Sequence, residues 1–140
     1  MSLLTTSETD AVLEKMFAPF IRRMGLKTLA VEERGATFLL PGDMDFVHGG
    51  GVICGQAIAS AADTCAILAL TAVNGQFRMV TTVDLTTHFI RPLKPVDTHV
   101  RIVIESNGKR MAYLRAEIAP AGTDRLAATA TGAFMYLDWR

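Results

Sequence analysis

Hydrophobic positions recur along this chain with two periods, one typical of helices and one typical of strands. Near the N-terminus, apolar residues return every three or four positions over residues 13–24, which predicts a helix. Ser7 and Asp10 form the capping box expected at the start of this helix. Pro19 interrupts the pattern and Gly25 ends it, so we expect a break in the helix before it stops.

Six segments are rich in alternating apolar and polar residues and predict strands. They span residues 26–33, 36–40, 78–90, 98–107, 110–119 and 125–137. We expect a tight turn at Arg34-Gly35, and Asn107-Gly108 is the strongest hairpin signal in the chain. Simple alternation places Thr82 and His88 on the same polar face of their strand.

One long segment, residues 54–73, is apolar on every side and predicts a buried central helix that Asn74-Gly75 ends. Asp63 is the only carboxylate, lysine or arginine between Phe46 and Phe77. An antiparallel sheet curled around this helix would bury it. The expected fold class is therefore α+β, with the sheet wrapped around a long helix and a further helix at the N-terminus.

Composition narrows the class of protein. The 140 residues fit a single domain over 1–140, half of them are hydrophobic, and the formal net charge is zero. Without a basic stripe we expect no nucleic-acid partner. The chain shows no secretory signal pattern, and its longest apolar run carries Asp63, so we expect no membrane span and a cytoplasmic protein. Three histidines and two cysteines lack ligand spacing, so no metal site is expected.

The start of the central helix is the candidate for chemistry. The glycines at 49–51 and Gly55 allow close approach of backbone to a ligand. The first amides of a helix have no internal partner and carry the positive end of its dipole, so they would bind an anion or a polarised carbonyl. Asp63 lies nine residues after Cys54, and burial would raise its pKa and make it a better general base.

The stretch from His48 to Asp63 resembles the hotdog-fold thioesterases of the phenylacetate-type (PaaI-like) branch. Their pattern is approximately Asn-x-x-Gly-x-x-His-Gly-Gly followed by an acid nine residues after the His. The strand over residues 82–92, which ends in Phe-Ile-Arg-Pro, resembles their second block. The order of elements agrees over nearly the whole chain. The resemblance implies a hotdog fold and hydrolysis of an acyl-CoA thioester.

Two alignments with that pattern compete. In the first, His48-Gly-Gly is the family motif and the acid position falls on Ala57. In the second, Asp63 is the acid, Cys54-Gly-Gln replaces His-Gly-Gly, and His48 stands where the family has Asn. We favour the second alignment because it retains the acid, the earlier glycine at Gly51 and the alanine-rich helix.

In the favoured alignment, the resemblance implies a role for each matching residue. The Gly55 N–H would polarise the thioester carbonyl, Asp63 would act as general base or nucleophile, and Thr82 would lie near the water. The residues implied in substrate binding are His48, Gly51, Cys54, Gln56 and Arg91, with Lys94 a further candidate for the nucleotide phosphates. The resemblance also implies a homo-oligomer, a dimer or dimer of dimers, with active sites at the subunit interface. It implies no cofactor except coenzyme A as part of the substrate.

Three alternatives stay open at this stage. A hotdog enoyl-CoA hydratase would need an Asp/His pair near the helix start, for which Asp45 and His48 are the candidates. A non-catalytic acyl-CoA binding module is suggested by Cys54 and Gln56, which depart from the family pattern. Finally, Asp63 could cap a second helix that begins after it, since Asp is a preferred N-cap residue.

Overall fold

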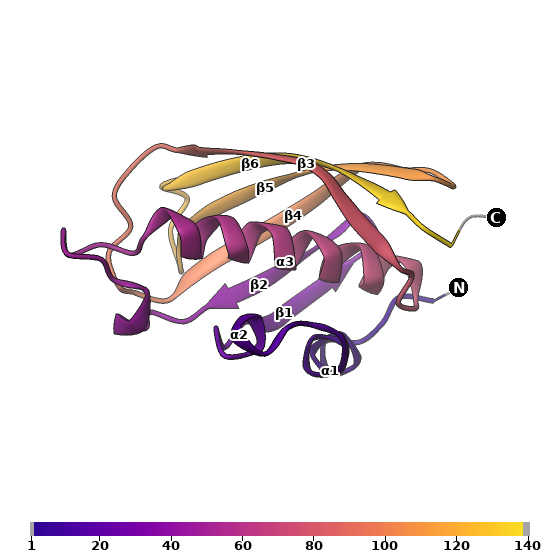
Figure 1. The fold of residues 1–140 in the computed structure, drawn as a ribbon, viewed down its shortest axis with the longest axis horizontal. Helices are drawn as coiled ribbons and strands as arrows, with labels where there is room; N and C mark the ends of the chain where they lie inside the picture. Colours follow the sequence, from indigo (N-terminus) through magenta and orange to yellow (C-terminus); the bar gives the residue numbers. More distant parts are fainter. Residues whose placement is uncertain (1, 139–140) are drawn as a thin grey trace.

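The structure, a computed structural model, describes residues 2–138. Its six strands are β1 (Lys27–Glu32), β2 (Gly35–Leu40), β3 (Val80–Phe89), β4 (Thr98–Asn107), β5 (Met111–Pro120) and β6 (Ala128–Tyr136). They form one antiparallel sheet in the order β1-β2-β4-β5-β6-β3. The sheet curves around a long helix, α3 (Gly55–Asn74), as Figure 1 shows. This is the hotdog fold expected from the sequence.

The central helix is the core of the fold. Small side chains on α3, Ala61 and Ala66 among them, are fully buried and let the strands pack closely against it. The helix is continuous through Asp63, so this residue does not cap a second helix. Gly75 ends α3 with φ of 75°, the left-handed conformation that glycine adopts without strain. By length and hydropathy α3 could span a membrane, but 67% of its apolar 18-residue window is buried, as in a core helix.

The N-terminal segment forms two helices, α1 (Thr6–Met16) and α2 (Pro19–Arg22), so the break predicted at the proline is confirmed. The predicted capping box was wrong, because Thr5 and Glu8 form it two residues earlier. Asp10 instead accepts a hydrogen bond from the backbone N–H of Thr28 in β1, at 2.8 Å. Asp10 therefore joins α1 to the sheet rather than starting the helix.

A β-bulge in β3 corrects the predicted face of Thr82. Thr82 pairs with Phe134 of β6 and Asp84 pairs with the next residue, Ala133, so Val83 is the extra residue of the bulge. The insertion reverses the alternation at this point. Thr82 consequently faces α3, whereas His88, opposite Thr129, lies on the outer face of the sheet. The two residues are on opposite faces, contrary to the prediction.

Two turns also differ from the sequence prediction. The turn between β1 and β2 consists of Glu33 and Arg34, with Gly35 already paired in β2. The hairpin between β4 and β5 is confirmed, but its last pair is Asn107 with Ala112, which leaves four residues between the paired positions. A two-residue type I′ turn would require positive φ at both central residues, and Gly108 does not have it.

Candidate active site

The first residue of α3 is Gly55, and Cys54 is its N-cap. The Cys54 side chain makes no capping hydrogen bond, and within residues 2–138 neither the Gly55 N–H nor the Gln56 N–H has an acceptor. Two backbone donors therefore point out of the positive end of a 20-residue helix. A carbonyl oxygen that develops negative charge would be stabilised at this position.

A short hairpin leads into this helix start and holds His48. Val47 pairs with Ile53, and the His48 N–H donates to the carbonyl of Val52. The turn closes through Gly51, which has φ of +84°. The His48 Nδ1 accepts a hydrogen bond from the Gly50 N–H at 2.8 Å, so the proton of the neutral ring is on Nε2.

The two alignments with the family pattern place the motif in different elements of the structure. His48-Gly-Gly lies in the hairpin, before the helix, whereas Cys54-Gly-Gln lies at the helix start. The first helical amide belongs to Gly55. Ala57, the acid position of the first alignment, is buried at 9% exposure. Asp63, the acid of the second alignment, is only partly buried.

Asp63 and Thr82 are in direct contact. The Thr82 hydroxyl donates to Asp63 Oδ1 at 2.7 Å, a short hydrogen bond of the charge-assisted kind. Both side chains are partly buried, and the bulge in β3 is what directs Thr82 toward the helix. With Oδ1 occupied by the threonine, Oδ2 has no hydrogen-bond donor among the described residues. The pair thus presents an oriented carboxylate oxygen at the surface of α3.

In one copy of the chain, the helix start and Asp63 are too far apart to act on one bond. Asp63 is eight positions after Gly55, which is about 12 Å along a helix axis. At 100° per residue they also lie about 80° apart around the axis. A single carbonyl group cannot contact both. The two halves of the predicted site are therefore each formed, but one chain does not bring them together.

The helix start borders a mostly apolar pocket of about 280 Å³. A Cβ on Gly55 would come within 3.3 Å of the Phe89 ring, so glycine permits this ring to pack against the helix start. Phe89 and Ile90 are 56% and 50% exposed, which is unusual for large apolar side chains. Sequence patterns did not identify Phe89 as a site residue, because it reads as an ordinary strand residue.

Arg91 also lines this pocket, and its guanidinium donates to the carbonyl of Leu126 at 2.6 Å. The remaining predicted site residues are spread around the helix start: Gln56 is exposed and Cys54 is partly buried. The other cysteine, Cys65, is fully buried, and burial raises the pKa of its thiol well above the ordinary value. Cys65 is therefore a core residue and not a nucleophile.

Asp45 and His48, the pair that a hydratase would need, make no hydrogen bond to each other in the described chain. Asp45 is exposed in the short 3-10 helix η1 (Met44–Phe46), and His48 is bonded to the backbone of its own turn. No group of three or more His, Cys, Asp or Glu side chains within residues 2–138 is arranged to hold a metal ion.

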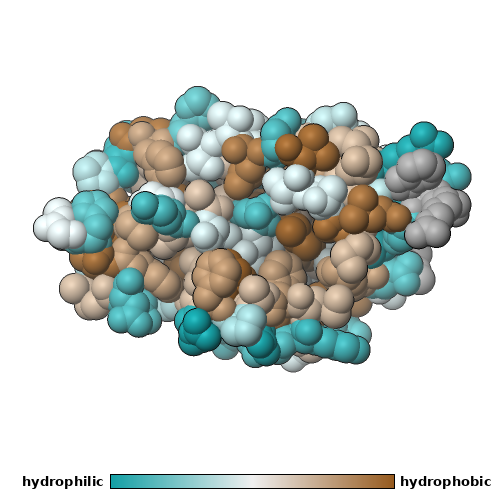
Figure 2. Space-filling model, in the orientation of Figure 1, coloured by the Kyte–Doolittle hydropathy of each residue, from teal (hydrophilic) through white to brown (hydrophobic). Residues whose placement is uncertain are grey.

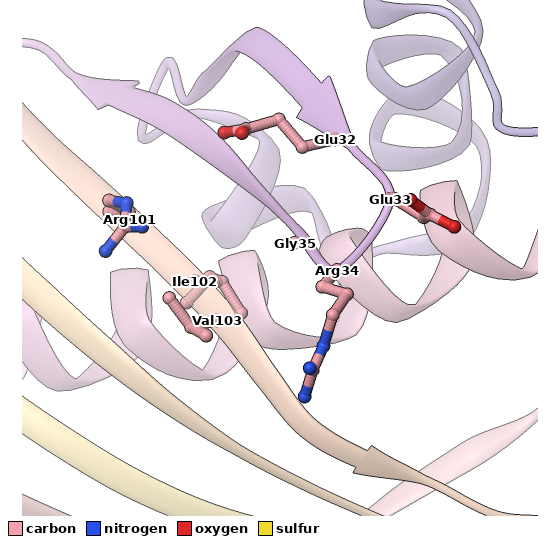
Figure 3. Close-up of a pocket in the computed structure, with 7 residues that line it drawn as sticks. All are labelled: Glu32, Glu33, Arg34, Gly35, Arg101, Ile102 and Val103. Atoms are coloured by element: carbon pink, nitrogen blue, oxygen red, sulfur yellow. The ribbon is translucent and has the colours of Figure 1, made fainter.

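Another pocket, of about 240 Å³, lies where the β1–β2 turn meets β4 (Figure 3). Arg34 lines this pocket, and its guanidinium donates hydrogen bonds to the carbonyls of Ile104 and Glu105. These bonds fasten the turn to the neighbouring strand. None of the candidate site residues lines this pocket, so it plays no part in the site at the helix start.

One family of known proteins matches the part of the chain that contains these residues. The sequence model of the thioesterase superfamily matches residues 44–127, a segment that includes the helix start, Asp63, Thr82 and Arg91. None of the curated proteins matches the sequence.

Solved structures share the fold over almost the whole chain. The conserved protein PA5202 from Pseudomonas aeruginosa is 25% identical, with a TM-score of 0.79 over 89% of this chain and 98% of its own. The thioesterase HI1161 from Haemophilus influenzae is 15% identical, with a TM-score of 0.85 over 99% and 96%. Zebra fish thioesterase superfamily member 2 is 14% identical, with a TM-score of 0.83 over 95% and 99%.

The structural likenesses at 14% and 15% identity support the fold alone, whereas the sequence model covers more than half of the chain. That match includes both the helix start with its unpaired amides and the Asp63–Thr82 pair. The chain belongs to the thioesterase superfamily.

Proposed function

We propose that this protein hydrolyses acyl-CoA thioesters, as a member of the PaaI-like branch, in a homodimer whose two active sites lie between the subunits. The observation that carries the proposal is the separation of two complementary half-sites. The Gly55 amide can polarise a carbonyl, and Asp63 can activate water, but about 12 Å of helix separates them. A second copy would supply the missing half to each site.

The helices of such a dimer would run antiparallel. If Gly55 of one subunit faces Asp63 of the partner subunit, the symmetry axis passes near Ala59, midway between them. Ala59 and Ser60 are both small and partly exposed, so the two helices could approach closely there. The exposed side of α3 continues from Gln56 through Ser60 and Asp63 to Ile67, at the spacing of one helix face.

The β3 edge of the sheet, beside α3, could also form part of the interface of this dimer. β3 is an edge strand that pairs only with β6, so its other side has unused backbone donors and acceptors. Val83 and Phe89 on this strand are 51% and 56% exposed, and the face that α3 and β3 share is largely apolar or neutral (Figure 2). Pairing of β3 with β3 of a second copy would continue the sheet and bring the two helices side by side.

The proposed chemistry follows from the two half-sites. The thioester carbonyl would accept a hydrogen bond from the Gly55 N–H. Asp63 of the partner subunit would take a proton from water as the water oxygen bonds to the carbonyl carbon. When the C–S bond breaks, the thiolate receives a proton, and the products are the free acid and coenzyme A. Thr82 would hold Asp63 in position through the 2.7 Å hydrogen bond, and direct nucleophilic attack by Asp63 uses the same arrangement.

The remaining predicted residues would contact the substrate. His48 would serve as a neutral donor through Nε2–H, because the Gly50 N–H already occupies Nδ1. Gly51 shapes the turn that holds His48, and Cys54 and Gln56 flank the Gly55 amide. Arg91, which lines the apolar pocket, would lie along the coenzyme A arm.

A matched pair of variants at Gly55 tests the proposed role of its amide. Gly55→Pro removes the N–H, and proline is well tolerated at the first position of a helix. Cys54, which precedes it, already has φ −69° and ψ 150°, a conformation compatible with a following proline. Gly55→Ala keeps the N–H and adds the same Cβ beside Phe89.

We expect thiol release from a panel of acyl-CoA esters by the wild-type protein. Gly55→Pro should lower kcat about 100- to 1,000-fold, the effect of losing one oxyanion donor, and Gly55→Ala should lower it much less. Equal losses in the two variants would argue against the amide. Absence of thiol release by the wild-type protein over the whole panel would refute the function and favour a binding module.

Subunit mixing tests the composite site. Asp63→Asn and Gly55→Pro are each expected to be inactive alone. When they are denatured together and refolded, half of the dimers are mixed, and each mixed dimer has one site with both wild-type groups. About a quarter of wild-type activity should therefore return. No recovery in a refolded mixture that contains heterodimers would place both groups in the same subunit's site and contradict the dimer proposal.

A further inference from the structure

The chain has two asparagines, Asn74 and Asn107, and each is followed by a glycine. Asn74 is the last residue of α3, and Asn107 is the last residue of β4. An asparagine before glycine is especially prone to deamidation, because glycine has no Cβ to hinder attack of its backbone nitrogen on the asparagine side chain. The sequence thus has two reactive sites, 33 positions apart.

The fold brings both asparagine side chains together with Tyr136. Asn74 Nδ2 donates to the Tyr136 hydroxyl at 2.8 Å, the hydroxyl donates to Asn107 Oδ1 at 2.7 Å, and Asn107 Nδ2 donates to Asn74 Oδ1 at 2.9 Å. Each group gives one of these hydrogen bonds and receives one, so the bonds form a closed cycle in which each strengthens the next. We call this cycle the amide triangle. It joins the end of α3 to the β4–β5 hairpin and to β6.

Tyr136 is the buried member of the amide triangle. It is 1% exposed, and burial raises the pKa of its hydroxyl, so the group stays protonated and can donate. The Arg78 guanidinium lies 3.7 Å from the centre of the Tyr136 ring and pairs with Asp138 at 2.7 Å. These contacts hold the tyrosine, and the tyrosine in turn fixes both amides.

The backbone nitrogens that would attack are restrained as well. The Gly75 N–H donates to the carbonyl of Ala72 at 3.3 Å, and the Gly108 N–H donates to the carbonyl of Met111 at 2.8 Å. With both the attacking nitrogen and the side chain held by hydrogen bonds, the two groups are not free to react. Deamidation in the folded protein therefore requires a local opening of the triangle.

The two asparagines differ in how easily such an opening occurs. Asn74 is half-buried at the end of the 20-residue core helix. Asn107 is exposed, as are all of residues 105–110 at this end of the β4–β5 hairpin. Exposed hairpin ends open at a lower free energy than core helices do. Asn107 is thus the residue that should react first.

We propose that Asn107 is a site of spontaneous deamidation, that the amide triangle restrains this reaction, and that the deamidated residue can no longer close the triangle. The Gly108 nitrogen loses its proton and bonds to Asn107 Cγ, and the bond from Cγ to Nδ2 breaks to release ammonia. Water then opens the five-membered imide and leaves aspartate or isoaspartate. In sum, amide and water give carboxylic acid and ammonia, and no group is oxidised or reduced.

The product lacks the donor that the triangle needs. A carboxylate accepts hydrogen bonds but donates none, so the bond to Asn74 Oδ1 is lost and two oxygens face each other. Isoaspartate also adds a methylene to the backbone, which disturbs the pairing of Asn107 with Ala112. The hairpin is then loosened from the end of α3. This end is about 30 Å from the helix start, so the inference does not depend on the proposed hydrolysis.

The first experiment measures the rate of deamidation in the folded protein. Wild-type and variant proteins are incubated in mildly alkaline buffer, and peptide mapping by mass spectrometry follows the conversion of the amide to the acid at each asparagine. Tyr136→Phe removes one hydrogen bond that closes the triangle, so Asn107 should deamidate about two- to tenfold faster. Asn74→Ala opens the triangle without altering the buried tyrosine and should have the same effect.

Two control variants separate the triangle from other causes. Tyr113→Phe removes the hydroxyl of the other tyrosine, which is 48% exposed on β5, and should leave the rate unchanged. Asp10→Ala removes a hydrogen bond at the β1 edge, a strand that pairs with neither β4 nor β6. It lowers overall stability and leaves the triangle intact, so it should accelerate deamidation much less than Tyr136→Phe does. Circular dichroism shows whether each variant is folded.

Urea-denatured wild-type protein gives the rate of the unrestrained site and should react at least about tenfold faster than the folded protein. Equal rates in the folded and denatured protein would overturn the role of the triangle. So would equal acceleration by Asp10→Ala and Tyr136→Phe. Absence of conversion at Asn107 in the folded Tyr136→Phe and Asn74→Ala variants would exclude it as a modification site.

The second experiment tests the product. Asn107→Asp reproduces the aspartate form, and its melting temperature, followed by circular dichroism, should fall by about 3–6 °C. Ser106→Asp adds the same charge one position earlier, on an exposed side chain outside the triangle, and should change the melting temperature by less than about 2 °C. Equal melting temperatures of Asn107→Asp and the wild type would show that a carboxylate can still close the triangle, contrary to the proposal.

Discussion

The two edges of the sheet each have an aspartate beside them, and the two carboxylates are used in different ways. At the β1 edge, Asp10 accepts the backbone N–H of Thr28. At the β3 edge, Asp63 accepts the side-chain hydroxyl of Thr82. Asp10 therefore accepts a hydrogen bond from the backbone of its edge strand, β1. Asp63 bonds only a side chain of its edge strand, so it leaves the backbone groups of β3 free to pair.

Both edge strands also contain a bulge with an exposed apolar residue. Leu29 is 41% exposed at the bulge of β1, and Val83 is 51% exposed at the bulge of β3. The β1 edge is short and lies under α1, while the β3 edge is ten residues long and lies beside the candidate site (Figure 1). The β1 edge is thus closed by α1, whereas the β3 edge is open in one copy of the chain, and it is there that we propose a partner subunit binds.

The largest expected effect comes from exchanging one aspartate at a time for asparagine. Asp63→Asn keeps the acceptor for Thr82 but removes the base, so thioester hydrolysis should fall about 100- to 10,000-fold. The free energy of unfolding in urea should change by less than about 0.5 kcal/mol. Asp10→Asn is the matched control and should keep at least half of the activity. Unchanged turnover in Asp63→Asn would remove it from the mechanism.

The next largest effect concerns the two bulges. Val83→Lys places a charge in the proposed β3 interface, where desolvation is costly, so the Kd of the dimer should rise about 100-fold. Sedimentation velocity over a range of protein concentrations measures this change. Leu29→Lys makes the same exchange at the closed edge and should leave the oligomeric state unaltered. A dimer that persists in Val83→Lys at low concentration would contradict an interface through β3.

A smaller effect is expected from the hydroxyl that orients Asp63. Thr82→Val removes the donor and keeps the shape of the side chain, so kcat should fall about tenfold with little change in KM. Thr87→Val alters a threonine on the same face of β3 that makes no described side-chain hydrogen bond. Steady-state kinetics of the two variants compare the positions, and equal values would assign Thr82 a structural role only.

The closed edge should respond in stability instead of activity. Asp10→Ala leaves the N–H of the buried Thr28 without its acceptor, so the free energy of unfolding should fall by about 1–3 kcal/mol. Urea denaturation followed by circular dichroism measures the loss. Activity per folded molecule should be retained, and a large loss of kcat without loss of stability would show that the two edges are not separate.

The smallest expected effect is a pH dependence of stability that arises from Glu8. This residue lies in α1, the helix that covers the closed β1 edge. The Thr5 backbone N–H and the Thr5 hydroxyl lower the pKa of Glu8 from its usual value of 4.5. The folded state therefore binds this proton less readily than the unfolded state. The stabilisation is present above about pH 4.5 and is lost as the pH falls through the lower, folded pKa. In Glu8→Gln the melting temperature should fall less between pH 7 and pH 3 than in the wild type.

Much of the fold could be predicted because its signals are local. The all-round apolar helix, its glycine stop and the order of six strands follow from periodicity, and each agrees with the structure to within one to three residues. The sequence also picks out Asp63, because a single charge in a long apolar helix is conspicuous. A resemblance over two short blocks then indicates the thioesterase superfamily, which the family match shows.

Other features depend on contacts between distant segments, and sequence alone could not reveal them. Asp10 was assigned to a helix cap, but its partner, Thr28, is 18 residues away. The bulge at Val83 reverses the face of Thr82, and only pairing with β6 shows where the extra residue falls. One pocket brings Arg91 together with Arg125, 34 positions further on.

The sequence by itself thus determined the elements, the core helix and the position of the candidate acid. Periodicity, turn residues and an isolated charge are properties of neighbouring positions, and they act before the chain is folded. The tertiary structure decided how the acid is oriented, which edge is open and which cations meet. Strand register and loop packing bring those groups together, and both depend on the whole sheet.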